Sequence, residues 1–464
     1  MTLFFPARLV AVAVTALLAA CSSMAPTYER PPAPVADTWL QDATTDSTRA
    51  AADIDWQGFF PDPRLRELIA LALQGNRDLR ISVLQVEQAR AQYQIRQADR
   101  VPTLNAQLNG SRASASNSGS LYTAGVAITA WEIDFFGRIA SLGDAALAQF
   151  LATGEGRKAA QISLVAAVAN TWLSLVADED LLAITRQTLA TRRESLRLAR
   201  LRFDSGVTSE LDFRQAESLT ESARVTLAQL QRQRAVDENA LVQLIGQPLP
   251  TPLRATAGID AVALPDVPAG APSDLLVRRP DIRQSEQQLL AANANIGAAR
   301  AAFFPRISLT AGVGAASSQL TELISGGSWG FTLAPSLLLP IFDAGRNQAN
   351  LRSATVNRDI AIAQYERSIQ AAFREVADAL AGQRTLADQL QAQRAVAQAE
   401  SARLRLSDLR YTNGVASYLD LLDAQRSLFA AQQALVQTRL AQLQSQVTLY
   451  KALGGGWSEP AAQP

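Results

Sequence analysis

Few residues of this sequence could do chemistry. Its 464 residues include no histidine and a single cysteine, Cys21. Histidine-based catalytic triads, Cys/His metal sites and disulfide frameworks are therefore excluded. An enzyme would have to use carboxylates, lysine, serine or tyrosine, and no carboxylate pair has the spacing of a glycosidase-like site. We predict that the protein is not an enzyme and binds no metal or cofactor.

One charged pair, Asp423 and Arg426, lies three residues apart on one face of an expected helix. A matching earlier segment has Gln215 and Ser218 at these positions, although its surroundings are otherwise similar. Because everything else around the turn is matched, this extra charged pair is where we expect a function. The alternative is an ordinary surface pair within one helix.

These residues belong to a segment of about 170 residues that occurs twice. The run Gly206-Val207-Thr208-Ser209-Glu210-Leu211-Asp212 matches Gly414-Val415-Ala416-Ser417-Tyr418-Leu419-Asp420, and Gly137-Arg138 matches Gly345-Arg346. We predict an internal two-fold repeat in which each copy contains a helix, two strands and two helices. The expected segments are a signal peptide (1–20), an N-terminal anchor and equatorial segment (21–75), the first repeat (76–247), an equatorial linker (248–278), the second repeat (279–453) and a tail (454–464).

Each copy holds two runs in which apolar and polar residues alternate, as in strands with one apolar face. The apolar members are Leu104, Ala106 and Leu108; Tyr122, Ala124, Val126, Ile128 and Ala130; Ile307, Leu309, Ala311 and Val313; and Trp329, Phe331, Leu333, Leu337 and Leu339. Each run has about ten residues, the length that a tilted strand needs to cross a bilayer. A strand of a soluble sandwich would alternate in the same way.

Four strands are too few for one chain to close a barrel, and an open edge in lipid would leave backbone groups unpaired. Several chains must therefore combine their strands. Two chains would give about eight strands around a filled interior, and three would give about twelve around an open lumen. The small and polar residues of the inner face favour the open lumen.

The segments from Arg138 to Phe203 and from Arg346 to Tyr411 contain no proline. Each could form one helix of about 65 residues, or roughly 100 Å. Gly206 and Gly414 are expected to end these helices, and Ser209 and Ser417 to cap the next ones, with Asp212 and Asp420 at the third helical position. We interpret Asp212 and Asp420 as structural. The stretch from Ala159 to Ala177 lacks charge, but its second copy carries charges, so we expect an amphipathic helix that packs on a partner.

The N-terminus is typical of an exported protein, with Arg8 before an apolar stretch that is too short to span a bilayer. Leu18-Ala19-Ala20-Cys21 resembles the lipobox of bacterial lipoproteins, which predicts lipidation of Cys21, with a palmitate among its acyl chains. Ser22 after this cysteine favours the outer membrane. Lys plus Arg and Asp plus Glu balance at 43 each, which removes the electrostatic case for nucleic acid.

The run from Arg278 to Ile282 and the run Ala291-Ala292-Asn293-Ala294-Asn295-Ile296-Gly297-Ala298-Ala299-Arg300-Ala301-Ala302-Phe303-Phe304-Pro305 resemble the TolC-like outer-membrane factors of tripartite efflux systems. Within them, the chain is most similar to the OprM/NodT-type lipoprotein branch. The resemblance implies an α+β membrane protein in which each chain of a homotrimer contributes four strands to a 12-stranded transmembrane β-barrel. A long periplasmic α-helical barrel would continue it.

The resemblance also implies partners and site residues. A periplasmic adaptor protein and an inner-membrane pump would dock on the channel. Leu419 would be the apolar constriction of a periplasmic gate, and Asp423 and Arg426 its charged lock. Six residues would form the helix tips that contact the adaptor: Gly206, Val207, Ser209, Gly414, Val415 and Ser417.

We therefore expect an outer-membrane exit duct of a tripartite efflux pump of the RND type, which conducts drugs or other small molecules passively and contributes to antibiotic resistance. Two alternatives remain open. The first is the outer-membrane channel of a type I protein secretion system. The second is a lipid-anchored coiled-coil scaffold without a pore.

Overall fold

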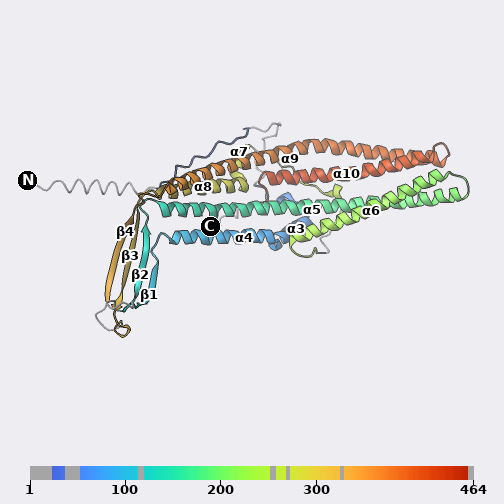
Figure 1. Ribbon diagram of the computed structural model, residues 1–464. Coiled ribbons are helices and arrows are strands. Elements are labelled where there is room, and N and C mark those ends of the chain that lie inside the picture. The colour runs from blue at the N-terminus through green and yellow to red at the C-terminus, as the bar shows by residue number, and fades with distance from the viewer. Residues whose placement is uncertain are drawn as a thin grey trace, which may run out of the picture. The chain divides into compact units, whose positions relative to one another are not determined.

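The computed structural model describes residues 23–36, 53–112, 120–250, 258–267, 272–323 and 329–457. Within these ranges the protein is mostly helical and has one four-stranded sheet (Figure 1). The expected signal peptide and the expected lipidation site, Cys21, lie outside the described residues.

The elements follow the same order in the two halves of the sequence. The first half has α4 (Arg77–Ala98), β1 (Leu104–Ser111), β2 (Leu121–Ile133), α5 (Arg138–Asp204) and α6 (Glu210–Ile245). The second has α8 (Pro280–Ala301), β3 (Arg306–Ser317), β4 (Trp329–Leu338), α9 (Arg346–Thr412) and α10 (Tyr418–Ala452). The expected helices and strands are thus present, with ends that differ by a few residues. Helices α5 and α9 each have 67 residues, or roughly 100 Å.

The segments outside these halves contain short elements: α2 (Trp56–Phe59), α3 (Pro63–Gly75), η3 (Ile259–Ala261) and α7 (Pro272–Arg278), while η4 (Leu320–Glu322) follows β3. The sequence analysis did not anticipate α3. The Asp62 carboxylate caps it by accepting from the backbone N–H groups of Arg64 and Leu65, and Pro63 occupies the first helical position. Its buried side chains are Leu65, Leu68, Ile69 and Ala72, at helical spacing.

The chain divides into two compact units, and each takes residues from both halves of the sequence. Unit 1 comprises Met1–Ala33, Leu84–Glu155 and Arg283–Ser368, and it contains the sheet. Unit 2 comprises Pro34–Val83, Gly156–Ile282 and Ile369–Pro464, and it contains both turns between the long helices and those that follow them.

In unit 1, the four strands lie in the order β1-β2-β3-β4 and are antiparallel throughout. Their register aligns the predicted apolar residues in rows on one face of the sheet. One row is Leu104, Ile128, Ala311 and Leu333, and the next is Ala106, Val126, Val313 and Phe331. Many of these side chains are exposed, with Phe331 at 84% and Leu104 at 68%. The face that large apolar residues cover is therefore open to the surroundings.

In unit 2, the middle of α5 supplies much of the core. Val165, Val168, Ala169, Trp172 and Leu173 are all at most 2% exposed. Among the described residues, α5 alone is long and apolar enough to pass as a membrane span by composition, and 56% of that stretch is buried inside the protein. Its burial agrees with the expectation of a helix that packs on partners within the protein.

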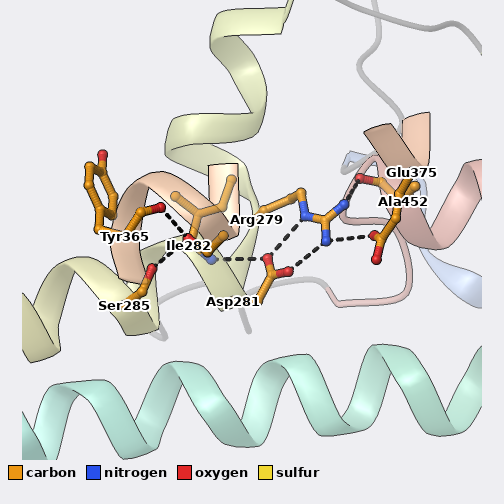
Figure 2. A network of polar contacts seen from close by, with 8 residues as sticks. Arg279, Asp281, Ile282, Ser285, Tyr365, Glu375 and Ala452 are labelled. Carbon is orange, nitrogen blue, oxygen red and sulfur yellow. Dashed lines mark hydrogen bonds and ion pairs between the residues drawn. The ribbon is translucent and has the colours of Figure 1, made fainter. Parts of the chain in front are cut away.

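In each half, a side-chain hydrogen bond joins the residue just before the first helix to the end of the last helix, and we call this contact a polar clasp. In the first half, the Asn76 side-chain amide donates to the carbonyl of Leu244, at 2.9 Å. In the second, the Arg279 guanidinium donates to the carbonyl of Ala452, also at 2.9 Å (Figure 2). Asn76 and Arg279 occupy corresponding positions, because each lies two residues before an aspartate in the first turn of the helix, Asp78 of α4 or Asp281 of α8. Each clasp satisfies a carbonyl group near the C-terminal end of a helix, which lacks a partner in the helix itself.

The two clasps differ in charge. Arg279 is only 6% exposed, and its guanidinium also binds the carboxylates of Asp281, at 2.6 Å, and Glu375, at 2.9 Å (Figure 2). Burial acts to lower the pKa of Arg279, but the two carboxylates outweigh it and hold that pKa above its usual value. The second half therefore holds a buried cation where the first has a neutral amide.

Candidate gate at the helix tips

The six predicted adaptor contacts lie at the two turns of unit 2. Gly206 and Gly414 have φ angles of +73° and +72°, a left-handed conformation that ends α5 and α9 as predicted. The N–H groups of Val207 and Val415 donate back to the carbonyls of Arg202 and Arg410, both at 2.8 Å. The valine side chains are exposed, Val207 at 75% and Val415 at 67%. Ordered turns with exposed valines are suited to contact another protein.

Ser209 and Ser417 are the N-cap residues of α6 and α10, as predicted. At Ser417 the capping box is complete: its hydroxyl accepts from the backbone N–H of Asp420, whose carboxylate accepts from the N–H of Ser417. The Asp212 carboxylate accepts from the hydroxyls of Thr208 and Ser209, at 2.8 Å each. The predicted capping positions of Asp212 and Asp420 are confirmed.

The predicted lock residues lie one turn further along α10. Asp423 and Arg426 form an ion pair on this helix, and Asp423 also accepts from the Arg403 guanidinium of α9, at 2.5 Å. Arg403 makes further contacts with Glu400 and with the hydroxyl of Ser427, both at 3.3 Å. The Asp423 carboxylate therefore lies between two guanidinium groups and links α9 to α10. We call Arg403, Asp423 and Arg426 the charged triad. Leu419 is 56% exposed and lies four residues before Asp423, on the same side of α10.

The sequence analysis missed Arg403. The signal for it was present, because the matching position of the first half is Ser195, just as Gln215 and Ser218 match Asp423 and Arg426. All three members of the charged triad are thus uncharged in the first half. A comparison that covers both helices of the turn would have found the third residue.

Contacts between the two helix pairs of unit 2 also escaped the sequence analysis. The Arg202 guanidinium of α5 lies over the Tyr411 ring of α9, 5.3 Å from its centroid, and also donates to its hydroxyl. The rings of Tyr411 and Tyr418 are 5.3 Å apart. Arg202 and Tyr411 do not stand out in either half, so this contact requires the three-dimensional structure.

The charged triad has a defined response to pH. Hydrogen bonds from Arg403 and then Arg426 hold the pKa of Asp423 below its ordinary value of about 3.9. At every pH above its ordinary pKa, the ionised Asp423 carboxylate stabilises the contact between α9 and α10. This stabilisation is lost as the pH falls through the lowered pKa. We therefore expect single-channel conductance to stay constant from about pH 8 to pH 5 and to rise only below about pH 4.

The control for this pH prediction is Asp423→Asn, in which that acidic transition should disappear. A change of conductance near neutral pH that persists in Asp423→Asn would assign the transition to other groups.

The chain matches the model of the family described as "Outer membrane efflux protein" over residues 68–247 and 271–455. It is 46% identical to the probable efflux pump outer membrane protein TtgC of Pseudomonas putida, over 98% of this chain and 97% of that protein. It is 45% identical to the outer membrane protein OprJ of Pseudomonas aeruginosa, over the same shares of the two chains.

Solved structures agree with this similarity. The open state of the MtrE outer membrane channel of Neisseria gonorrhoeae superposes with a TM-score of 0.87 at 41% identity, over 94% of this chain and 98% of that one. A membrane protein from Pseudomonas aeruginosa gives a TM-score of 0.88 at 45% identity, over 95% of this chain and 99% of that one.

Fold and site together define a channel protein of the bacterial outer membrane. The chain belongs to the outer membrane efflux protein family, which is a family of channels and not of enzymes. The predicted family, location and efflux function are confirmed.

Proposed function

We propose that this protein is the passive exit duct of a tripartite efflux pump of the RND type. It conducts drugs or other small molecules from a periplasmic adaptor and an inner-membrane pump to the exterior, and the inner-membrane pump supplies the energy. The observation that carries this proposal is the sheet of unit 1. Within the described residues, it combines an exposed apolar face with two edges that have no backbone partners, in a chain of the efflux channel family.

The sheet edges support a homotrimer. In the described chain β1 pairs only with β2, and β4 only with β3, so each has one edge without backbone partners. Unpaired N–H and C=O groups cost several kcal/mol each in lipid, and closure into a barrel removes them. Three copies supply about twelve strands, which leaves a water-filled lumen.

In this arrangement the lumen is lined by the face of the sheet opposite the apolar one. Its rows contain Asn105, Ala127, Gly312 and Thr332, and next to them Gln107, Gly125, Gly314 and Gly330. A Cβ atom on Gly125 would lie 2.5 Å from the Val313 carbonyl oxygen, and one on Gly314 would lie 2.4 Å from that of Ala124. Small residues in these rows allow the strands to approach and leave space for solvent.

The remaining assignments follow from this architecture. The helices of each copy form the periplasmic helical barrel, and the charged triad and Leu419 close it. The turns at Gly206 and Gly414, with their exposed valines, bind the adaptor. Acyl chains on Cys21 add a second attachment to outer-membrane lipid, because several chains hold a protein firmly where one would not.

Two measurements test the proposal. The purified protein, inserted in planar bilayers, should conduct ions, and a deletion strain should become hypersensitive to toxic small molecules while its secreted proteins remain unchanged. Loss of a secreted protein with unchanged drug sensitivity would instead favour a type I secretion channel. A protein that does not conduct would be a scaffold without a pore.

A further inference from the structure

A cavity of about 450 Å³ lies inside unit 2, where the helix pair α5/α6 meets the pair α9/α10. All four helices contribute to its wall, for example through Leu198 of α5, Asp212 of α6, Asp408 of α9 and Gln425 of α10. Its volume is in the range of small-molecule sites. A ligand in this cavity would therefore contact both helix pairs at once.

The wall of this cavity combines aromatic rings with an unsatisfied polar group. The Tyr411 and Tyr418 rings both line it. Gln425 is only 9% exposed, and its side-chain oxygen Oε1 is buried without a hydrogen-bond partner. A buried carbonyl oxygen without a partner is costly, so a donor group inside the cavity would be stabilised there.

The charges around the cavity favour a cation. The carboxylates of Asp212 and Asp408 line it, and within the described part of the chain neither forms an ion pair. Glu194 also lines the cavity but is paired with Arg197, at 2.6 Å. Among the described residues that line the cavity, Arg202 is the single cation, and its guanidinium already lies over the Tyr411 ring. The lining groups therefore carry an excess of negative charge.

We propose that this cavity is a binding site for organic cations of drug size. The ammonium group would lie against the Tyr418 ring and near the Asp408 carboxylate, and a donor on the ligand would reach Gln425 Oε1. Burial raises the pKa of Tyr418 to about 12, so this ring stays a neutral phenol in the periplasm. Because the ligand bridges α5/α6 and α9/α10, it holds the helix pairs together and disfavours opening. This last consequence rests on the proposed channel function.

Calorimetric titration of the purified full chain in detergent with phenyltrimethylammonium tests the site. We expect saturable binding that weakens about fivefold in Asp408→Asn and at least about tenfold in Tyr418→Leu. Gln425→Leu should keep the fold, because it replaces an amide whose oxygen is buried without a partner by an apolar group of similar size. For an analogue that carries a donor, benzyldimethylammonium, which stays protonated at neutral pH, Gln425→Leu should weaken binding, whereas phenyltrimethylammonium, which has no donor, should bind as before.

Asp388→Asn is the matched control. This carboxylate lies on the same helix, is exposed, and is 20 residues from Asp408, which is about 30 Å along α9. It should leave the affinity unchanged. Absence of saturable binding, or equal weakening by Asp388→Asn and Asp408→Asn, would overturn the site.

Conductance in planar bilayers separates this site from the channel function. Saturating phenyltrimethylammonium should lower the open probability of the wild-type channel but not that of Tyr418→Leu. Binding without any effect on a conducting channel would refute the role in gating and leave the binding site. A protein that binds the cation but never conducts would refute the proposed function instead.

Discussion

We expect channels that carry Asp423→Asn to conduct severalfold more than the wild type in planar bilayers, and those that carry Asp423→Asn with Arg426→Gln to conduct at an intermediate level. In the structure Asp423 accepts from Arg403 of α9 and from Arg426 of its own helix. The single substitution leaves two guanidinium groups next to each other without the carboxylate, so attraction becomes repulsion. The double substitution removes one of these two charges, and it should therefore open the gate less.

This order of conductance distinguishes a lock from an ordinary surface pair. Glu221 and Arg224 form a matched control on α6: they are also three residues apart and exposed, at 2.8 Å. Glu221→Gln with Arg224→Gln should leave conductance unchanged. Equal conductance of the wild type, Asp423→Asn and the double variant would remove the charged triad from the gate.

Arg279→Met is expected to cause the largest loss of stability among the substitutions considered. Removal of one partner from a buried ion pair costs about 3–5 kcal/mol, because it leaves the other charges unpaired. The carboxylates of Asp281 and Glu375 are 41% and 49% exposed, so water compensates in part and we expect roughly 2–3 kcal/mol. The variant also leaves the carbonyl of Ala452 without its donor.

Thermal unfolding of the purified protein in detergent measures this loss. Arg374→Met is the matched control, because Arg374 is 82% exposed and, within the described part of the chain, pairs only with Asp378, also exposed, four residues further along α9. It should cost less than about 0.5 kcal/mol. If both variants unfolded at the same temperature, the clasp at Arg279 would not hold the second half together.

Patterns that repeat over many residues made most of the fold predictable. The two proline-free segments became the 67-residue helices α5 and α9, and alternating residues became four strands whose register aligns the apolar rows. These signals are local, and each is read within one element. Helix α3 was missed because residues 21–75 were treated as one anchor and equatorial segment, although Asp62 and Pro63 mark the start of a helix within it.

The candidate site was predictable only in part. Asp423 and Arg426 stood out because the repeat offered a comparison at each position. Arg403 lies 20 residues away on another helix, and Arg202 meets Tyr411 from the other half of the chain. Such contacts depend on how helices pack, which no periodicity within one element encodes.

The two free edges of the sheet come from different halves of the chain: β1 from the first and β4 from the second. They differ in sequence, so a ring that is sealed through them must join the β1 edge of each copy to the β4 edge of the next, always in the same rotational sense. A copy whose β1 edge carried a proline could still pair with one neighbour through its β4 edge, but it would leave an unpaired seam at its β1 edge. When such a copy is produced together with the normal chain, it should have a dominant-negative effect on the pore.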